Sequence, residues 1–339
     1  MLILGIESSC DETAGAVCNN GTIISNVVLS QDVHQQFGGV VPEIASREHD
    51  SQISSIIDKT LEKASITYSD INAIAVTYGA GLMGALLVGL SYAKGLSIAL
   101  NIPFVGVNHL EGHLYASFIS YPDMEYPYLC LLVTGGHTQI WEVQSPGNYI
   151  LHSTTVDDAA GEAFDKAARV LGLGFPGGPE IQKMAEKAKD EIDPLPRPQI
   201  KNSLDFSFSG LKTALVRRAE SEGFYPLVDN RGPSAYQTTE YSFAFQEAIV
   251  DCLIRNTKQA VLETNSKAVI LGGGVAANSR LRQRMNEVID IPIFVPRAPL
   301  CTDNGAMIGA AAFFNLKNGL PFQLDMDAVP NLRIGLTAE

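Results

Sequence analysis

The sequence predicts an α/β protein made of two similar halves with a cleft between them. The chain has 339 residues, the size of two average domains, and its 46% apolar and 18% charged residues are typical of a globular protein. Strand-like and helix-like apolar patterns alternate along it. The same order of patterns begins at residue 1 and again at residue 128, which indicates an internal repeat.

The first half opens with three expected strands, at residues 1–7, 14–18 and 22–29, and Asn20-Gly21 marks a hairpin turn between the last two. Pro42 suits the first turn of a helix, and Ile53, Ile57 and Leu61 recur at helical spacing after it. We therefore expect antiparallel strands first and parallel crossovers afterwards. The further elements expected are a helix at 42–64, a strand at 71–77, a helix at 84–99, a strand at 104–107 and a helix at 110–119.

The second half follows a linker at residues 121–127 that contains two prolines. It repeats the opening order and is interrupted by a proline-rich insertion at 194–198. The expected elements are strands at 128–133, 138–143 and 149–155, helices at 157–171, 210–220 and 242–263, a strand at 268–271, a helix at 278–288, a strand at 292–295 and a helix at 303–316.

Charge, cysteine content and hydropathy exclude several classes. The 24 basic and 37 acidic residues leave a net charge of −13, so the chain is a poor unaided binder of nucleic acid. Five scattered cysteines without a CxxC pair predict neither a disulfide framework nor a cysteine zinc site. The N-terminus lacks signal-peptide features, and Lys94, Asn101 and Pro103 interrupt the apolar stretch 79–107. We expect a cytoplasmic protein outside the membrane.

The segment His109-Leu110-Glu111-Gly112-His113 predicts a metal site. Histidines four residues apart lie on one face of a helix and can bind one cation, although such a pair also arises by chance. Asp303 could supply a carboxylate, or could simply cap the last helix. Two imidazoles and a carboxylate are typical of non-haem iron, with zinc as the alternative. Glu111 is turned about 200° from His109, which is not the geometry of a zinc protease.

Glycine-rich turns follow several of the predicted strands. The turn Thr134-Gly135-Gly136-His137 favours contacts of backbone N–H groups with phosphate or carboxylate oxygens, and Gly272–Asn278 suits contact with a nucleotide base or ribose. Residues 175–179 read as a rigid turn. The segment 79–84 matches GxGxxG but lacks the acidic residue of a dinucleotide site, so we interpret it as close packing of a helix on a strand.

Charged residues form smaller groups. Glu7, Asp11 and Glu12 lie together near the first turn, and four acids share the segment 157–165. Bunched carboxylates repel one another unless a solvent shell, a hydrogen bond or a cation compensates them. Basic residues on helices form two small patches that could contact RNA or be ordinary solvated faces; they are Lys212, Arg217, Arg218, Arg280, Arg282 and Arg284.

Seven blocks, running in one order from residue 1 to residue 314, together resemble the TsaD family, formerly called Gcp or O-sialoglycoprotein endopeptidase. They are Ile6–Thr13, Gly38–Glu43, His109–His113, Val133–Thr138, Gly161–Lys166, Phe206–Thr213 and Cys301–Gly305. The resemblance implies an actin-like ATPase fold (ASKHA, ribonuclease H-like) of two duplicated lobes with a central cleft. The expected lobes are residues 1–120 with 299–325, and residues 127–298 with a helical insertion.

The resemblance also implies an activity: transfer of a threonylcarbamoyl group from threonylcarbamoyl-AMP to the exocyclic amine of the adenosine 3′ to the anticodon, in tRNAs that read codons beginning with A. His109, His113 and Asp303 would hold one metal, iron(II) in most members, with zinc as the alternative. From their place at the mouth of the expected first lobe, Asp11 and Glu12 are our own candidates for orienting the incoming amine or a metal-bound water. The implied substrate contacts are Leu132, Val133, Thr134, Gly135, Gly136, His137, Asp165, Gly178, Asn278 and Glu180, the last because Gln182 stands where many members have an acid.

The family further implies TsaB-like and TsaE-like subunits, which we expect to supply much of the tRNA surface of so acidic a chain. Two other functions are compatible with parts of the sequence. A small-molecule kinase would share the fold and the glycine turns, and a metalloprotease is the older interpretation of the family. The orientation of Glu111 argues against the protease.

Overall fold

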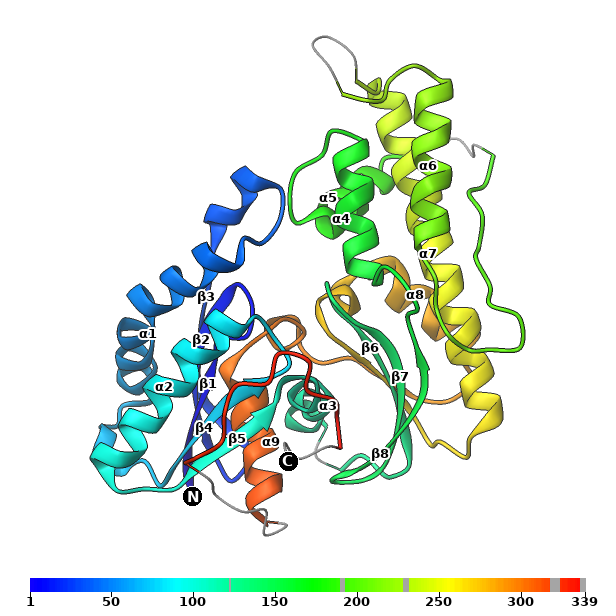
Figure 1. The fold of residues 1–339 in the computed structure, drawn as a ribbon. Helices are drawn as coiled ribbons and strands as arrows, with labels where there is room; N and C mark the ends of the chain where they lie inside the picture. Colours follow the sequence, from blue (N-terminus) through cyan, green and yellow to red (C-terminus); the bar gives the residue numbers. More distant parts are fainter. Residues whose placement is uncertain (122, 190–192, 228–231, 318–323, 336–339) are drawn as a thin grey trace. The chain divides into compact units, whose positions relative to one another are not determined.

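The computed structural model describes residues 1–121, 123–189, 193–227, 232–317 and 324–335, so residue 122 of the expected linker and residues 318–323 of the expected first lobe lie outside it. The chain forms two compact units (Figure 1). Unit 1 takes in residues 1–124, 145–149 and 296–339, and unit 2 takes in residues 125–144 and 150–295.

Unit 1 contains a five-stranded sheet in the order β3-β2-β1-β4-β5. The first three strands form the expected antiparallel meander, and β1 pairs with β4 in parallel, as does β4 with β5. The strands are β1 (Leu2–Glu7), β2 (Glu12–Asn19), β3 (Thr22–Ser30), β4 (Ala73–Gly79) and β5 (Phe104–Asn108).

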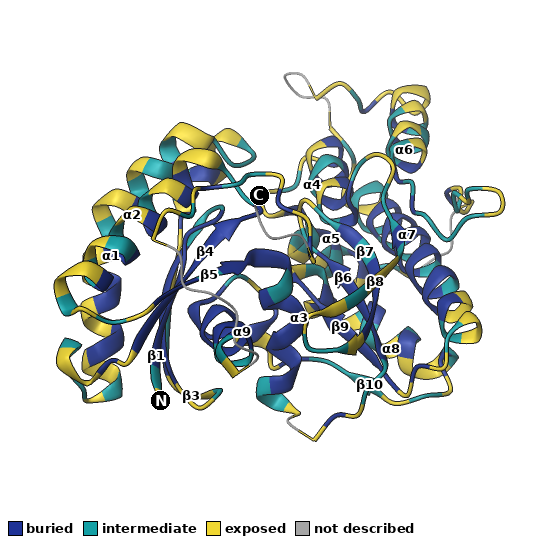
Figure 2. Ribbon diagram, turned by 60° about the horizontal axis from the view of Figure 1, so that its bottom comes forward, coloured by how far each residue is buried: buried dark blue, intermediate teal, exposed yellow. Residues whose placement is uncertain are grey.

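Helices cover the sheet of unit 1 and bury its apolar residues (Figure 2). Ile53 and Ile57 of α1 and Leu86 and Leu90 of α2 belong to one core cluster with the strands. The helices are α1 (Pro42–Ala64), α2 (Met83–Leu100), α3 (His109–Ser120) and α9 (Gly305–Lys317), with 3-10 helices η1 (Asp32–Phe37), η2 (Tyr68–Asp70) and η4 (Ala298–Leu300). Helix α2 is long and apolar enough to cross a membrane, but its buried face packs in this core, as expected from the sequence.

Unit 2 repeats the topology of unit 1. Its sheet has the order β10-β9-β6-β7-β8, which is the order of unit 1 with β6, β7 and β8 in the places of β1, β2 and β3. Strand β6 pairs antiparallel with β7 and parallel with β9. The predicted repeat is therefore confirmed. The strands are β6 (Tyr128–Val133), β7 (Thr138–Ser145), β8 (Asn148–Thr154), β9 (Val269–Gly272) and β10 (Ile293–Phe294).

The helices of unit 2 correct three sequence-based boundaries. The expected rigid turn at 175–179 is wrong, because Pro176 is the N-cap of a helix that begins at Gly177. The helix expected from residue 242 begins at Ala235, after a capping box formed by Ser234 and Gln237. The helix expected from residue 157 begins at Ala160. The helices are α4 (Ala160–Val170), α5 (Gly177–Ala185), α6 (Ser209–Ser221), α7 (Ala235–Glu263) and α8 (Ser279–Val288), with the 3-10 helix η3 (Gly274–Ala277).

Candidate metal centre and substrate site

Helix α3 presents the two histidines of the candidate metal centre. It begins at His109 because Asn108 caps it: the Asn108 side-chain oxygen accepts hydrogen bonds from the backbone N–H groups of Leu110 (2.9 Å) and Glu111 (3.3 Å). His109 and His113 are thus one helical turn apart, as the prediction required. Their rings meet edge to face with centroids 4.8 Å apart.

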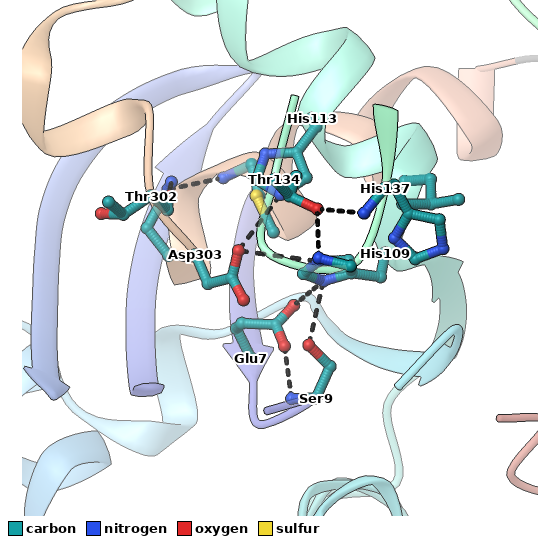
Figure 3. Close-up of polar contacts among 12 residues, drawn as sticks. Glu7, Ser9, His109, His113, Thr134, His137, Thr302 and Asp303 are labelled. Carbon is teal, nitrogen blue, oxygen red and sulfur yellow. Dashed lines mark hydrogen bonds and ion pairs between the residues drawn. The ribbon is translucent and has the colours of Figure 1, made fainter. Parts of the chain in front are cut away.

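Asp303 completes the centre from the turn before α9. The capping role that it could have had belongs to Asn304, whose side-chain oxygen accepts from the N–H of Met307 at 3.0 Å. The Asp303 Oδ1 atom lies 3.1 Å from His113 Nε2 and 3.5 Å from His109 Nε2 (Figure 3). One ligand atom from each of the three residues lies within 4.8 Å of the others. Residues far apart in the sequence therefore meet within unit 1.

Glu7 and Ser9 contact His109 on the side of its ring that faces away from Asp303. The sequence did not predict this role for either residue. His109 Nδ1 lies 3.1 Å from Glu7 Oε2 and 3.1 Å from Ser9 Oγ. Glu7 is fully buried at the end of β1, where it also accepts hydrogen bonds from Thr77 Oγ1 and the Ser9 N–H. A carboxylate on the far nitrogen of a ligating histidine is the usual second layer of a metal site. Only the clustering of acids near residue 7 pointed to this role.

The charges of the centre favour a bound cation. Burial alone would lower the pKa of His109, but the carboxylates of Asp303 and Glu7 outweigh it and raise this pKa to about 9. Burial would raise the pKa of Glu7, and the attraction of His109 reverses that shift, so this pKa lies below its usual value. Negative charge is therefore in excess around the two imidazoles.

The side chains present also fit a divalent metal. His113 is 1% exposed, and neither ring nitrogen makes a hydrogen bond of good geometry within the described part of the chain. Unsatisfied buried nitrogens are costly, and a cation at Nε2 would satisfy one of them. Two imidazoles and one carboxylate are a ligand set known for iron(II) and compatible with zinc.

Glu111 points away from this centre, as the helical geometry predicted. Its carboxylate accepts a hydrogen bond from Tyr149 Oη at 2.7 Å and contacts Asn315 Nδ2 at 3.5 Å. Burial raises the pKa of Glu111, although both partners act in the opposite direction. It therefore serves as a partly buried structural acid in unit 1.

The candidate acids Asp11 and Glu12 lie at the turn between β1 and β2. Burial, followed by the neighbouring carboxylates of Asp303 and Asp11, raises the pKa of Glu12 well above its usual value. The expected acidic group near the first turn thus interacts with the carboxylate of the candidate metal centre.

In unit 2, the first glycine turn joins β6 to β7. The Thr134 hydroxyl accepts from the N–H groups of Gly136 (3.2 Å) and His137 (2.9 Å), which fixes the turn. A Cβ atom added at Gly135 or Gly136 would meet no atom of the described residues within 4 Å. Both glycines therefore border open space, where a ligand could approach the backbone.

The residues just before this turn take a different part. Leu132 and Val133 are buried in β6, at 0% and 1% exposure, so their side chains belong to the interior and only their backbone could touch a substrate. Gly273 packs against this backbone: its φ is +86°, and a Cβ there would lie 2.4 Å from the Val133 carbonyl oxygen. The second glycine turn therefore lies directly beside the first.

Asp165 and Gly178 come from neighbouring helices. Asp165 Oδ1 accepts a hydrogen bond from the N–H of Gly177 at 2.6 Å, which ties α4 to the first turn of α5. Gly178 borders open space. Glu180 lies on the same first turn, with Oε2 4.0 Å from Lys183 Nζ.

Asn278 is both a helix cap and a candidate nucleoside contact. Its side-chain oxygen accepts from the N–H of Leu281 at 2.9 Å, and its amide nitrogen donates to Gln246 Oε1 at 2.9 Å. Gln182 accepts from the N–H of Ser279 at 2.9 Å, which joins α5 to the start of α8. The predicted substrate residues of unit 2 thus lie on connected elements around the ends of β6 and β9.

The four acids of segment 157–165 do not all lie on the expected helix, because Asp157 and Asp158 precede α4. Lys166 Nζ contacts Asp158 at 2.7 Å and Glu162 at 2.8 Å, so a cation compensates both carboxylates. Asp157 instead binds the start of α6, accepting from Ser207 and Ser209.

The basic residues of α8 are engaged inside unit 2. Arg280 makes two contacts with Glu247, at 2.7 and 2.8 Å, and Arg282 Nε donates to the carbonyl of Ala276. Arg284 contacts Glu287 at 3.1 Å and Asp251 at 3.9 Å. Acids thus compensate the positive charges of Arg280 and Arg284, which leaves these two residues little to offer RNA.

Comparison with known proteins identifies the family. The family model for TsaD, tRNA N6-adenosine threonylcarbamoyltransferase, matches residues 22–310. The chain belongs to the TsaD family. Two TsaD proteins with that enzyme name each align with 98% of this chain: one from Clostridium botulinum (strain Kyoto) is 46% identical, and one from Kosmotoga olearia is 48% identical. The alignments cover 98% and 99% of those proteins.

The family match confirms the predicted transferase that modifies tRNA, and neither the kinase nor the protease is favoured. Solved structures confirm the predicted actin-like fold. Full-length HypF aligns with 94% of this TsaD chain and 47% of its own, at a TM-score of 0.61 and 13% identity. The dehydratase component A of Acidaminococcus fermentans aligns with 92% of this chain and 98% of its own, at a TM-score of 0.56 and 15% identity.

Proposed function

We propose that this TsaD chain takes the threonylcarbamoyl group from threonylcarbamoyl-AMP and transfers it to the exocyclic amine of the adenosine 3′ to the anticodon. Membership of the family and the meeting of three ligand atoms within 4.8 Å of one another carry this proposal. In the reaction a C–N bond forms between the amine and the carbamoyl carbon. The bond from that carbon to the phosphate oxygen breaks, and AMP leaves.

His109, His113 and Asp303 would hold one divalent metal, iron(II) in our assignment and zinc as the alternative. When bound, such a cation stabilises negative charge on oxygens beside it. The contribution of the chain is to keep the three ligands in place, with Glu7 fixing the ring orientation of His109.

The adenylate would be bound by the glycine turns of unit 2. The backbone at Gly135 and Gly136 borders open space, so phosphate or carbamoyl oxygens could approach it closely; the Gly136 N–H itself donates to Thr134 Oγ1. Asp165, Gly178, Glu180 and Asn278 are assigned to the nucleoside part, because they lie on elements that contact one another. Leu132, Val133 and His137 complete the set, the first two through their backbone.

The amine must lose a proton when the new bond forms. We assign Asp11 and Glu12 to orienting the amine or a metal-bound water, with the ionised form of Glu12 as the proton acceptor. Burial, followed by the carboxylates of Asp303 and Asp11, raises the pKa of Glu12, so its ionised form binds a proton tightly.

Much of the tRNA surface would come from TsaB-like and TsaE-like subunits. The net charge of −13 and the compensated arginines of α8 leave this chain few cations for a phosphate backbone. We also assign residues 1–120 with 299–325 to the first lobe and residues 127–298 to the second, and place the protein in the cytoplasm.

The decisive experiment supplies threonylcarbamoyl-AMP and unmodified tRNA to the protein with its partner subunits and detects the modified nucleoside by mass. His113→Ala should abolish the product, because it removes one ligand. Glu111→Gln is the matched control: it lies on the same helix, two residues away, but faces Tyr149. It should retain most of the activity and the metal content of the unaltered protein.

Two results would contradict the assigned roles of the metal centre and of Glu111. Product formed at the normal rate by metal-free protein or by His113→Ala would exclude a role for the metal centre. Loss of tRNA modification in Glu111→Gln, with retained metal and fold, would give Glu111 a role in the transfer that its contact with Tyr149 does not predict.

A further inference from the structure

The GxGxxG segment of the sequence has no part in the proposed reaction, and the chain's own C-terminal segment accounts for it. We call residues 324–335 the strap. Ala328, Leu332 and Ile334 of the strap are buried, at 7%, 5% and 7% exposure, whereas Asn331 and Arg333 are exposed. Ala328 and Leu332 belong to the core cluster of unit 1.

The strap runs along the ends of β4 and β5, where glycines make room for it. A Cβ atom at Gly79 would lie 2.2 Å from the Val329 carbonyl oxygen and 2.7 Å from Leu332 Cβ. A Cβ atom at Gly106 would lie 2.0 Å from the sulfur of Met326. The first glycine of the motif therefore admits the strap, which leaves no space there for a dinucleotide.

One chain of contacts leads from the strap to the start of α3. The carbonyl oxygen of Arg333 accepts a hydrogen bond from Asn108 Nδ2 at 3.1 Å. The other end of the same amide, Asn108 Oδ1, caps α3 through Leu110 and Glu111. The strap thus holds Asn108, the cap of α3, in place. Since His109 is the first residue of α3, the position of Asn108 sets the orientation of this ligand.

A second chain of contacts reaches the ring of His109. The carbonyl oxygen of Pro330 accepts from the N–H of Gly81 at 3.0 Å, and the next N–H, of Leu82, donates to the carbonyl of Ser9 at 2.8 Å. A Cβ at Gly81 would lie 2.7 Å from that Ser9 oxygen, so the two backbones touch. Ser9 Oγ then contacts His109 Nδ1 at 3.1 Å.

We propose that the strap is a positioning element of the metal centre. It holds His109 in the ligating orientation by two routes, one through Asn108 and the other through Gly81, Leu82 and Ser9. This inference rests on the proposed metal centre. Outer contacts of this kind change metal affinity by about 10- to 100-fold. Unseating the strap should therefore weaken metal binding although no ligand is altered.

The test measures Co²⁺ affinity and the visible absorption of bound Co²⁺ in the full chain, without substrates. Leu332→Ala removes the buried anchor of the strap. Asn108→Ser keeps a good N-cap for α3 but is too short to reach Arg333. Both variants should bind Co²⁺ at least about 10-fold more weakly and show altered absorption. Asn331→Ala, an exposed strap substitution, should stay within about twofold of the unaltered protein.

Further variants separate positioning from general stability. Ile57→Ala removes a buried side chain of α1 in the same core cluster, outside the strap, and this variant should keep its Co²⁺ affinity. If Leu332→Ala does not fold by circular dichroism, Asn108→Ser decides. Unchanged affinity in the folded strap variants, or an equal loss in Ile57→Ala, would overturn the proposal while the metal centre stands. Unchanged binding in His109→Ala would instead remove the metal centre, and the strap's role with it.

Discussion

The substitution Gly136→Ala tests whether this glycine contacts the substrate or serves only the stability of the turn. Within the part of the chain that the structure describes, a Cβ atom at Gly136 meets no atom within 4 Å, and hydrogen bonds to Thr134 Oγ1 hold the turn. The substitution should therefore leave stability unchanged or raise it by up to about 1 kcal/mol, since alanine restricts the unfolded chain. If the adenylate packs against this turn, the added methyl group intrudes on it at a cost of about 1–3 kcal/mol, which corresponds to roughly 5- to 150-fold.

The assay is the KM for threonylcarbamoyl-AMP in tRNA modification, with stability followed by urea denaturation. Gly95→Ala is the matched control, because that glycine also borders open space but lies on α2, outside the proposed substrate site. Gly273→Ala is the opposite control: φ of +86° and a Cβ position 2.4 Å from the Val133 oxygen predict a loss of about 2 kcal/mol or more. A stable Gly136→Ala with an unchanged KM would refute contact between this turn and the donor.

Two further predictions concern charge. Because the pKa of His109 is raised to about 9, protons compete with the metal for this side chain below that pH. Without metal, protonated His109 contributes its full stability to the fold below about pH 6.5, and this contribution is lost as pH rises through 9. Stabilisation by a fixed Co²⁺ concentration in thermal unfolding should thus grow from pH 7 to 9, and Glu7→Gln should move this rise to lower pH; a flat profile would exclude His109 as a ligand. Asp157 Oδ1 accepts hydrogen bonds from the N–H groups of Phe208 and Ser209 at the start of α6, as the side chain of a helix cap does. Asp157→Ala should therefore lower stability by about 1 kcal/mol at pH 7. Burial opposes ionisation of Asp157, but hydrogen bonds from Ser207, Phe208 and Ser209 lower its pKa. The stability lost in Asp157→Ala should therefore be seen above about pH 4 and should fade in urea denaturation at pH 3. Equal losses of stability at both pH values would contradict a role for the ionised carboxylate.

The regular elements were predictable because local signals marked them. Asn20-Gly21 fixed the first hairpin, and the buried strands read as short apolar runs. Pro42 marked the start of α1. The repeat could be predicted because both halves use the same order of elements, and the sheet orders then follow from the handedness of the parallel crossovers.

Features whose backbone geometry depends on residues distant in the sequence could not be predicted from the sequence. Helix α5 was predicted as a turn because Gly177, Gly178 and Pro179 are poor signals for a helix, although Pro179 is tolerated in a first turn. The strap alternates apolar and polar residues on either side of Val329-Pro330 but forms no strand, and nothing in residues 324–335 alone indicates where it packs. The role of Asp303 was open for the same reason: Asp303 and Asn304 are both good caps, and only the fold assigns the cap to Asn304.

The GxGxxG segment shows why a glycine pattern is weak as a signal for a ligand. Glycine records only that something approaches the backbone closely, and the sequence does not say what. At Gly79 it is the strap, at Gly81 it is Ser9, and at Gly273 it is the strand before the first glycine turn of unit 2. Gly135 and Gly136 differ from these because a Cβ atom at either would meet no atom of the described chain within 4 Å. The turn at residues 134–137 is therefore a stronger candidate for binding the substrate than the turns at Gly79 and Gly273, and Gly178 borders open space in the same way.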